Sequence, residues 1–223
     1  MRSSLRPMID LRPVGYIIGR LLLLLGLLML IPASLDWVLD TGNAEGFLKS
    51  SLFTSGAGGM MVLSMRNAVG QGLSTRLAFL LTFGIWTLVP MFGALPFILG
   101  APGMSFTNAY FEAVSGITTT GSTVIIGLEG YPEGMNLWRG MLNWLGGLGI
   151  AFIAMIFLPV MRVGGMQFFR TEGFDTLGKI LPRASDIALS LLAVYTGLTV
   201  ICALTYLAIG MTALDATVHA MAS

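Results

Sequence analysis

Apolar residues occur in this chain in long blocks, separated by short polar stretches that carry most of the charges. A helix needs about 20 apolar residues to cross the hydrocarbon core of a membrane. Five blocks reach or approach that length, namely Val14–Ile31, Phe47–Met65, Leu77–Leu99, Gly140–Met161 and Ile187–Ile209. The second block is rich in Gly and Ser, which indicates close helix packing rather than contact with lipid. The pattern therefore predicts an all-α integral membrane protein.

Composition supports this prediction, because 55% of the 223 residues are hydrophobic and only 10% are charged. A soluble domain carries about 25% charged residues, so this chain has too few to coat a globule of its size. The net charge of +1 indicates neither nucleic acid nor an acidic partner. The single Cys202 excludes a disulfide framework and a Cys-based metal site. No A-x-A cleavage site follows the first apolar block, so we expect a retained helix rather than a signal peptide.

Charges of opposite sign alternate between the loops that join the apolar blocks. Basic residues precede the first block and fill every second loop after it: Arg2, Arg6, Arg12, Arg66, Arg76, Arg162, Arg170, Lys179 and Arg183. Acidic residues fill the other loops: Asp36, Asp40, Glu45, Glu129 and Glu133. Because basic loops face the cytoplasm, the N-terminus is expected there. Only Lys49 and Arg139 fall on the opposite side, and the acidic residues are interpreted mainly as solvated loop charges.

The segment Met104–Ser122 between the third and fourth blocks does not fit a crossing. Its first part, Ser105–Gly116, has a helical pattern, but twelve residues span only about 18 Å, which reaches the middle of a bilayer. Asn108, Glu112 and Ser115 share one face of that helix. Since both flanks lie on the outer side, the simplest path is a half-helix going in and an extended strand, Ile117–Thr123, coming out.

Non-helical backbone at membrane depth is tolerated where it lines a watery cavity, so this strand is predicted to line a pore. Its backbone carbonyls could replace the hydration shell of a cation, and Gly121 can adopt φ values that are closed to other residues. The alternative is an amphipathic surface helix followed by a Thr-rich loop, although such helices normally carry a strongly charged face. Glu112 could accept hydrogen bonds from strand amides, pair with a basic residue of another repeat, contact an ion or face an outer vestibule.

A weak internal repeat extends this reading. An offset of 107 positions aligns Arg76 with Arg183, Asn108 with Asp215 and Glu112 with His219. The second copy would end at Ser223, where its own strand should begin. We therefore expect the chain to be a fragment, because one pore loop cannot supply the ring of ligands that a pore needs.

Three motifs resemble one family of membrane proteins and occur in its order. They are LRPVGYIIG at Leu11–Gly19, FEAVSGITTTGS at Phe111–Ser122 and LWRGMLNWLGGLGI at Leu137–Ile150. They are similar to the TrkH/KtrB-type potassium transporters, the membrane subunits of bacterial potassium uptake. The resemblance covers the whole chain and matches the N-terminal half of a family member.

The resemblance implies two leading transmembrane helices in residues 1–66. A complete repeat of transmembrane helix, pore helix, filter strand and transmembrane helix would follow in residues 67–170, and an incomplete second repeat in residues 171–223. Carried over from the family, the backbone carbonyls of Thr119 and Thr120 bind potassium, and Thr118, Gly121 and Ser122 complete the filter. Asn108, Glu112 and Ser115 support it. Gly121 matches the potassium-type residue of the family.

The function implied is potassium uptake through a channel-like pore in the bacterial cytoplasmic membrane, without a cofactor. The implied partners are the C-terminal repeats of the same protein, a second copy in a homodimer, a cytosolic nucleotide-binding regulatory subunit of the TrkA type, and membrane lipid. One alternative is a non-conducting membrane scaffold or a truncated remnant, which would share every local motif. An intramembrane enzyme is the other, but the chain has no H-E-x-x-H motif, Ser–His pair or paired intramembrane aspartates.

Overall fold

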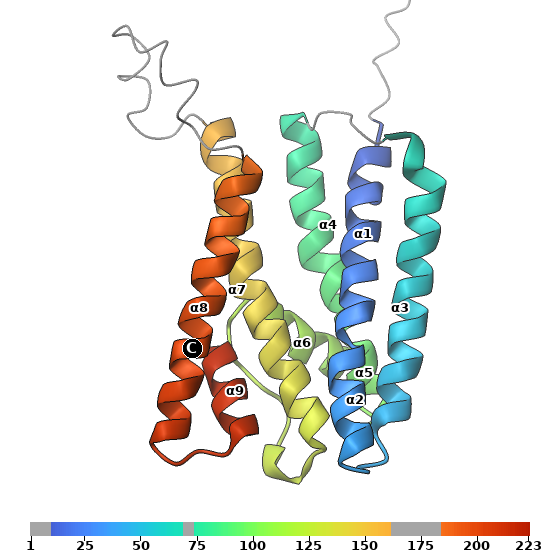
Figure 1. Cartoon of the computed structure of the whole chain (residues 1–223). Helices are drawn as coiled ribbons and strands as arrows, with labels where there is room; N and C mark the ends of the chain where they lie inside the picture. The colour runs from blue at the N-terminus through green and yellow to red at the C-terminus, as the bar shows by residue number, and fades with distance from the viewer. Residues whose placement is uncertain (1–9, 69–73, 162–183) are drawn as a thin grey trace, which may run out of the picture. The chain divides into compact units, whose positions relative to one another are not determined.

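A computed structural model describes residues 10–68, 74–161 and 184–223, and every regular element in these ranges is helical. The chain divides into two compact units, Met1–Tyr110 and Phe111–Ser223, which are described separately (Figure 1). The elements are α1 (Arg12–Leu28), α2 (Leu30–Val38), α3 (Ala44–Met65), η1 (Arg66–Ala68), α4 (Thr75–Gly93), α5 (Leu95–Leu99), α6 (Phe106–Ile117), η2 (Leu128–Gly130), α7 (Glu133–Met161), α8 (Ala184–Ala208) and α9 (Ala213–Ala222). The predicted division at residues 66 and 170 stays a prediction.

Three stretches of described helix are long and apolar enough to cross a membrane, namely Arg12–Val38, Arg76–Leu99 and Ala188–Ala208. The first two differ from the expected single helices, because each is interrupted near a proline. The helix is interrupted at Met29, between α1 and α2 and ahead of Pro32. A second interruption is at Ala94, between α4 and α5 and ahead of Pro96. A proline ring clashes with the carbonyl four residues earlier and lacks an N–H, so each helix is divided but keeps its apolar character.

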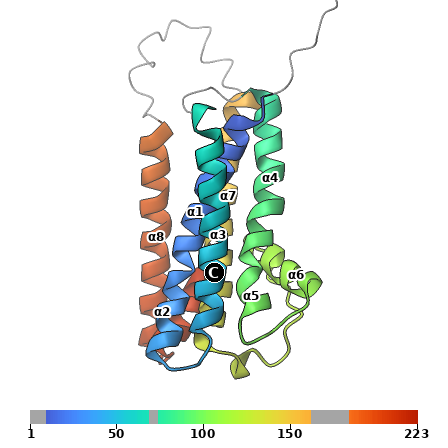
Figure 2. The ribbon, with the colours of Figure 1, turned by 90° about the vertical axis from the view of Figure 1, so that its right-hand side faces the viewer.

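Within the first unit, α1 lies between α3 and α4 (Figure 1), and α3 covers part of α1 when the molecule is viewed from the side of α3 (Figure 2). Glycines bring α1 and α3 together, since a Cβ at Gly19 would lie 2.9 Å from the Gly58 carbonyl oxygen, and one at Gly58 would lie 2.7 Å from that of Gly19. The Ser51 hydroxyl donates to the Gly26 carbonyl at 2.6 Å across the same interface. Gly and Ser in the second block therefore serve close packing as predicted, although Gly56 faces open space.

Asp36 corrects one expectation for the loops, because it is fully buried and not a solvated charge. The Asn43 side chain donates to the Asp36 carboxylate at 2.8 Å, and its amide oxygen accepts from the Ala101 N–H at 2.6 Å. The segment between α2 and α3 is thereby tied to the segment that follows α5. Nearby, a Cβ at Gly46 would lie 2.6 Å from the Gly100 Cα, so glycine is required for this approach.

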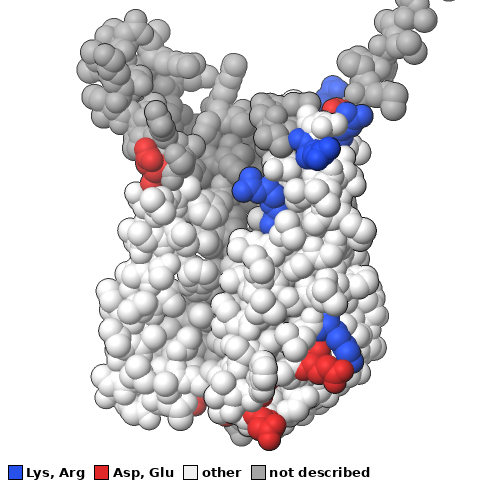
Figure 3. Space-filling model, turned by 45° about the vertical axis from the view of Figure 1, so that its right-hand side comes forward, with Lys and Arg blue, Asp and Glu red and all other residues white. Residues whose placement is uncertain are grey.

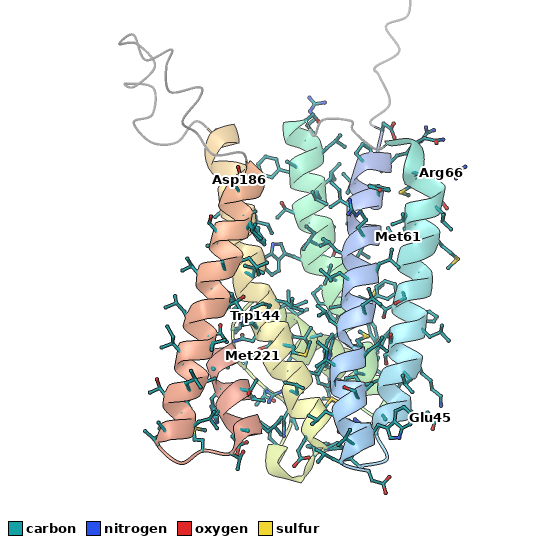
Figure 4. The ribbon with its side chains drawn as sticks, viewed as in Figure 1. Glu45, Met61, Arg66, Trp144, Asp186 and Met221 are labelled. Atoms are coloured by element: carbon teal, nitrogen blue, oxygen red, sulfur yellow. The ribbon has the colours of Figure 1, made fainter. Side chains whose placement is uncertain are left out.

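Most charges on this unit lie toward the helix ends, with the exposed Arg20, midway along α1, as an exception, and the rest of the surface is largely uncharged (Figure 3). Glu45 and Arg66 mark opposite ends of α3 (Figure 4). Lys49, one of the two exceptions to the charge pattern, forms an ion pair with Glu45 at 2.7 Å. The hydrogen bond from Lys49 and its positive charge lower the pKa of Glu45. The predicted basic residues Arg2, Arg6, Arg162, Arg170, Lys179 and Arg183 lie outside the described residues.

In the second unit, α9 packs against both α7 and α8 (Figure 1). The Asn143 amide donates to the Ala222 carbonyl at 3.3 Å, and the rings of Tyr206 and His219 meet edge to face. The Thr212 hydroxyl caps α9 by accepting from the Asp215 N–H at 3.2 Å. In the first unit, Ser105 accepts from the Asn108 N–H in the same way ahead of α6, 107 positions before Thr212.

Candidate functional site

The segment that follows α6 turns back along the side of α7. A Cβ at Gly116 would touch Leu142, and one at Gly146 would overlap the Ile117 carbonyl group, so the end of α6 reaches about 20 Å along α7 from its first residue. The chain then returns, because the Leu128 carbonyl accepts from the Asn136 amide at 3.1 Å, within the first turn of α7. The predicted re-entrant segment requires such a return of the chain, and its place in a membrane stays a prediction.

The turn itself is a helix C-cap in an unusual conformation. The Thr119 N–H donates to the Gly116 carbonyl at 2.9 Å, and the Thr120 N–H donates to the Ser115 carbonyl at 3.0 Å. These two bonds define a Schellman motif, in which the left-handed position normally holds Gly or Asn. Here it holds Thr119, at a φ of 56°. A β-branched residue in this region is strained by about 1–3 kcal/mol, and such strain gathers at functional sites.

The extended strand predicted for Ile117–Thr123 is not formed, because Ile117 is the last residue of α6 and a turn follows it. Beyond the turn the chain is irregular and exposed. Thr119, Thr120, Gly121 and Ser122 are all exposed, and Gly121 has a positive φ of 75°. Among the described residues, no group donates a hydrogen bond to the carbonyls of Thr118, Thr119, Thr120 or Gly121. Four successive carbonyl dipoles are therefore free to bind a cation, although one segment supplies only one side of a coordination shell.

Hydroxyl groups hold the two ends of this stretch. The Ser115 hydroxyl donates to the Ser122 carbonyl at 2.6 Å, which joins the predicted supporting residue to the last residue of the predicted strand. The Thr118 hydroxyl donates to the Val114 carbonyl at 2.8 Å and lies 2.8 Å from the Thr120 hydroxyl. The side chains thus bond to one another and to the helix, and the backbone carbonyls remain as the free acceptors.

Glu112 anchors the returning chain from within α6. It is 3% exposed, and its Oε1 accepts from the Thr123 hydroxyl and the Val124 N–H at 2.5 Å each and from the Ile125 N–H at 3.3 Å. The accepted amides lie directly after the predicted strand and not within it. A buried carboxylate is stable when its oxygens accept several hydrogen bonds. Hydrogen bonds to a charged group are also stronger than those between neutral groups.

The second oxygen of Glu112 pairs with Arg139 of α7, whose Nε donates to Oε2 at 3.3 Å. The sequence pointed instead to a basic residue of another repeat, and it missed Arg139. A signal was present, since Arg139 is the second exception to the charge pattern of the loops, and an isolated basic residue on that side needs a partner. Asn108 differs from the expected role, because its side chain is exposed and has no hydrogen bond within the described residues.

The described residues contain no group of three or more His, Cys, Asp or Glu side chains placed to hold a metal ion. His219, which the repeat pairs with Glu112, contacts the Tyr206 ring at 6.1 Å between centroids. The arrangement is suited to holding backbone carbonyls in place.

Comparisons with known proteins agree with one another. A family model described as TrkH, a cation transport protein, matches residues 46–222. The Trk system potassium uptake protein TrkI of Halomonas elongata is 40% identical over 212 residues, which are 95% of this chain and 43% of that protein. TrkH of Escherichia coli strain K12 is 37% identical over 215 residues, covering 95% of this chain and 44% of that protein.

A solved structure is similar over the same extent. The crystal structure of the potassium transporter TrkH from Vibrio parahaemolyticus superposes with a TM-score of 0.83 at 33% sequence identity. The match covers 96% of this chain and 42% of that one. The chain therefore spans less than half the length of the relatives that it resembles.

Proposed function

Because the chain belongs to the TrkH family of cation transport proteins, a family of transporters and not of enzymes, we propose that it forms part of a pore for potassium uptake. The observation that carries this proposal is the set of four successive carbonyls, from Thr118 to Gly121, that the described chain leaves without hydrogen bonds. Carbonyl rings of this kind replace the hydration shell of potassium in selective pores.

In this proposal the carbonyls of Thr119 and Thr120 bind the ion, and Thr118, Gly121 and Ser122 complete the filter segment. Glu112 and Ser115 support the segment from α6. The potassium ion is the transported substrate and not a cofactor. Positive φ values at Thr119 and Gly121 reverse the local turn of the backbone and so change the direction in which successive carbonyls point.

One segment binds an ion on one side only, so the rest of the coordination shell has to come from further segments of the same protein. Two observations support a second repeat. α8 is long and apolar enough to cross a membrane, and α9 follows it as a short helix. The caps Ser105 and Thr212 stand at the offset that relates the two copies. We accordingly assign α4 to α7 to a first repeat and α8 with α9 to the start of a second.

The membrane proposed is the bacterial cytoplasmic membrane, with the N-terminus in the cytoplasm. The two basic residues that break the charge pattern, Lys49 and Arg139, both lie in ion pairs with acidic residues. The orientation rests on the nine basic residues of the other loops, which outnumber these two. A homodimer and a cytosolic nucleotide-binding regulatory subunit of the TrkA type are the further partners proposed.

The test is growth and ion flux in bacteria that lack their own potassium uptake systems. The complete transporter, as its own cell produces it, is expressed in these bacteria. Its amount in the membrane is measured by immunoblot. We expect growth at low potassium and uptake of rubidium that external potassium inhibits. Absence of rescue at normal expression would overturn the proposal and favour a non-conducting scaffold.

A further inference from the structure

Three residues of α7 and α8 form a closed set of contacts. The Tyr195 hydroxyl donates to the Trp144 carbonyl at 3.2 Å, and the two rings lie 5.3 Å apart. The Trp144 indole N–H donates to the Thr199 hydroxyl at 3.0 Å, and that hydroxyl donates to the Tyr195 carbonyl at 2.9 Å. Figure 4 labels Trp144 midway along α7. The set joins the last helix of the proposed first repeat to the first helix of the second.

This set lies directly beside the part of α7 against which Ile117 and Thr119 pack. A Cβ at Gly147 would lie 2.5 Å from the Tyr195 hydroxyl oxygen and 3.9 Å from the Thr119 methyl group. At the preceding residue, Gly146, a Cβ would overlap the Ile117 carbonyl group. Two adjacent glycines therefore let a single turn of α7 receive the loop and the tyrosine together.

Thr119 depends on such support more than its neighbours do. Its left-handed backbone is strained, and a strained residue keeps its conformation only when the surrounding structure holds it. Ser115 and Gly116 hold it from α6 through the C-cap bonds, and the Gly146–Gly147 turn holds it from α7. The position of that turn depends in part on Tyr195, which bonds to the carbonyl of Trp144 in the same turn.

We propose that Tyr195 is a positioning residue for the ion-binding loop, acting through the Trp144–Gly147 turn of α7 on the backbone of Thr119. The inference rests on the proposed potassium uptake function and adds to it a residue of the second repeat. Tyr195 does not contact the ion. Its hydroxyl sets where the α7 turn stands, and thereby where the carbonyls beside Thr119 point.

The test compares Tyr195→Phe with Thr205→Val in the complete transporter. Thr205 is the matched control, because it lies on the same helix and its hydroxyl donates at 2.8 Å to the Ile201 carbonyl of that helix. Loss of one hydrogen bond is expected to lower potassium-over-sodium discrimination about fivefold in Tyr195→Phe and to leave it unchanged in Thr205→Val. A merely structural role would instead reduce uptake of both ions by the same factor.

A double-mutant cycle with Gly147 tests the same contact from the other side. Gly147→Ala places a methyl group against the Tyr195 hydroxyl oxygen and should impair discrimination. In the Tyr195→Phe background that oxygen is gone and the next atom, Cζ, is 3.5 Å away, so the same substitution should cost little more. Should Tyr195→Phe fail to reach the membrane, Gly147→Ala carries the comparison with Thr205→Val.

Three results would overturn the inference: unchanged discrimination in Tyr195→Phe, an equal loss for both ions, or additive effects in the cycle. Each is read in a wild-type protein that takes up potassium. A wild-type protein that takes up none is a separate result, because it overturns the proposed function together with the inference that rests on it.

Discussion

Replacing Glu112 by Gln tests the anchor of the loop while keeping its shape. Gln can still accept from the Val124 and Ile125 amides through its oxygen, but its NH₂ group faces Arg139 Nε, which is also a donor. The exchange therefore removes one charged interaction and sets two donors against each other. The Glu112 side chain is only 2% exposed and that of Arg139 is 23% exposed, so water can replace the lost partner of Arg139 only in part.

Breaking a buried ion pair by removing one partner costs about 3–5 kcal/mol. Hydrogen bonds to a charged group are worth about 1.5–3 kcal/mol, against about 0.5–1.5 kcal/mol for neutral ones. Since Gln keeps the amide bonds and Arg139 keeps some access to solvent, we expect Glu112→Gln to lower the free energy of unfolding by about 3 kcal/mol. The double variant Glu112→Gln with Arg139→Gln should recover part of that loss, because it removes the unpaired guanidinium.

Thermal unfolding of the purified protein in detergent measures this loss, with and without potassium. The matched control is Glu45→Gln, which breaks the exposed pair with Lys49 and should leave the transition unchanged. Stabilisation by potassium should also weaken in Glu112→Gln, because the carbonyls that bind the ion are less well held. If Glu112→Gln unfolds like Glu45→Gln, the carboxylate does not anchor the loop and the reasoning fails.

Three further predictions concern backbone conformation and helix packing. Gly121→Ser should weaken potassium-over-sodium discrimination in flux assays, because a side chain at a φ of 75° adds about 1–2 kcal/mol of backbone strain, although no atom lies within 4 Å of the added Cβ. Unchanged discrimination would remove Gly121 from the filter. Thr119→Gly should keep or raise the thermal transition, because relief of about 1–3 kcal/mol of strain offsets the added entropy of the unfolded glycine; a clear fall would show that Thr119 is unstrained. Gly58→Ala should cost about 1–3 kcal/mol in thermal unfolding because its Cβ meets the Gly19 carbonyl, and a cost no greater than that of Gly56→Ala would contradict the close approach of α1 and α3.

Local pattern was sufficient for much of the fold. Uninterrupted apolar blocks predict helices wherever lipid replaces water, because the backbone must then satisfy its own hydrogen bonds. The half-helix in Ser105–Gly116 was predictable for the same reason, since its length is set by the sequence and it is too short to cross. Two prolines also divide expected helices, at Met29 and Ala94, and the hydrophobic pattern alone did not predict these interruptions.

By itself, then, the sequence determined the membrane class, the helical blocks and the position of the loop, because each depends on residues close together in the chain. Only tertiary structure decided which distant groups meet. Arg139 pairs with Glu112 across 27 positions, and Tyr195 reaches Trp144 across 51. Such pairs of residues depend on how α6, α7 and α8 pack, which the hydrophobic periodicity of the sequence does not predict. The strain at Thr119 was hidden for the same reason, since a threonine takes a left-handed conformation only when contacts from elsewhere hold it there.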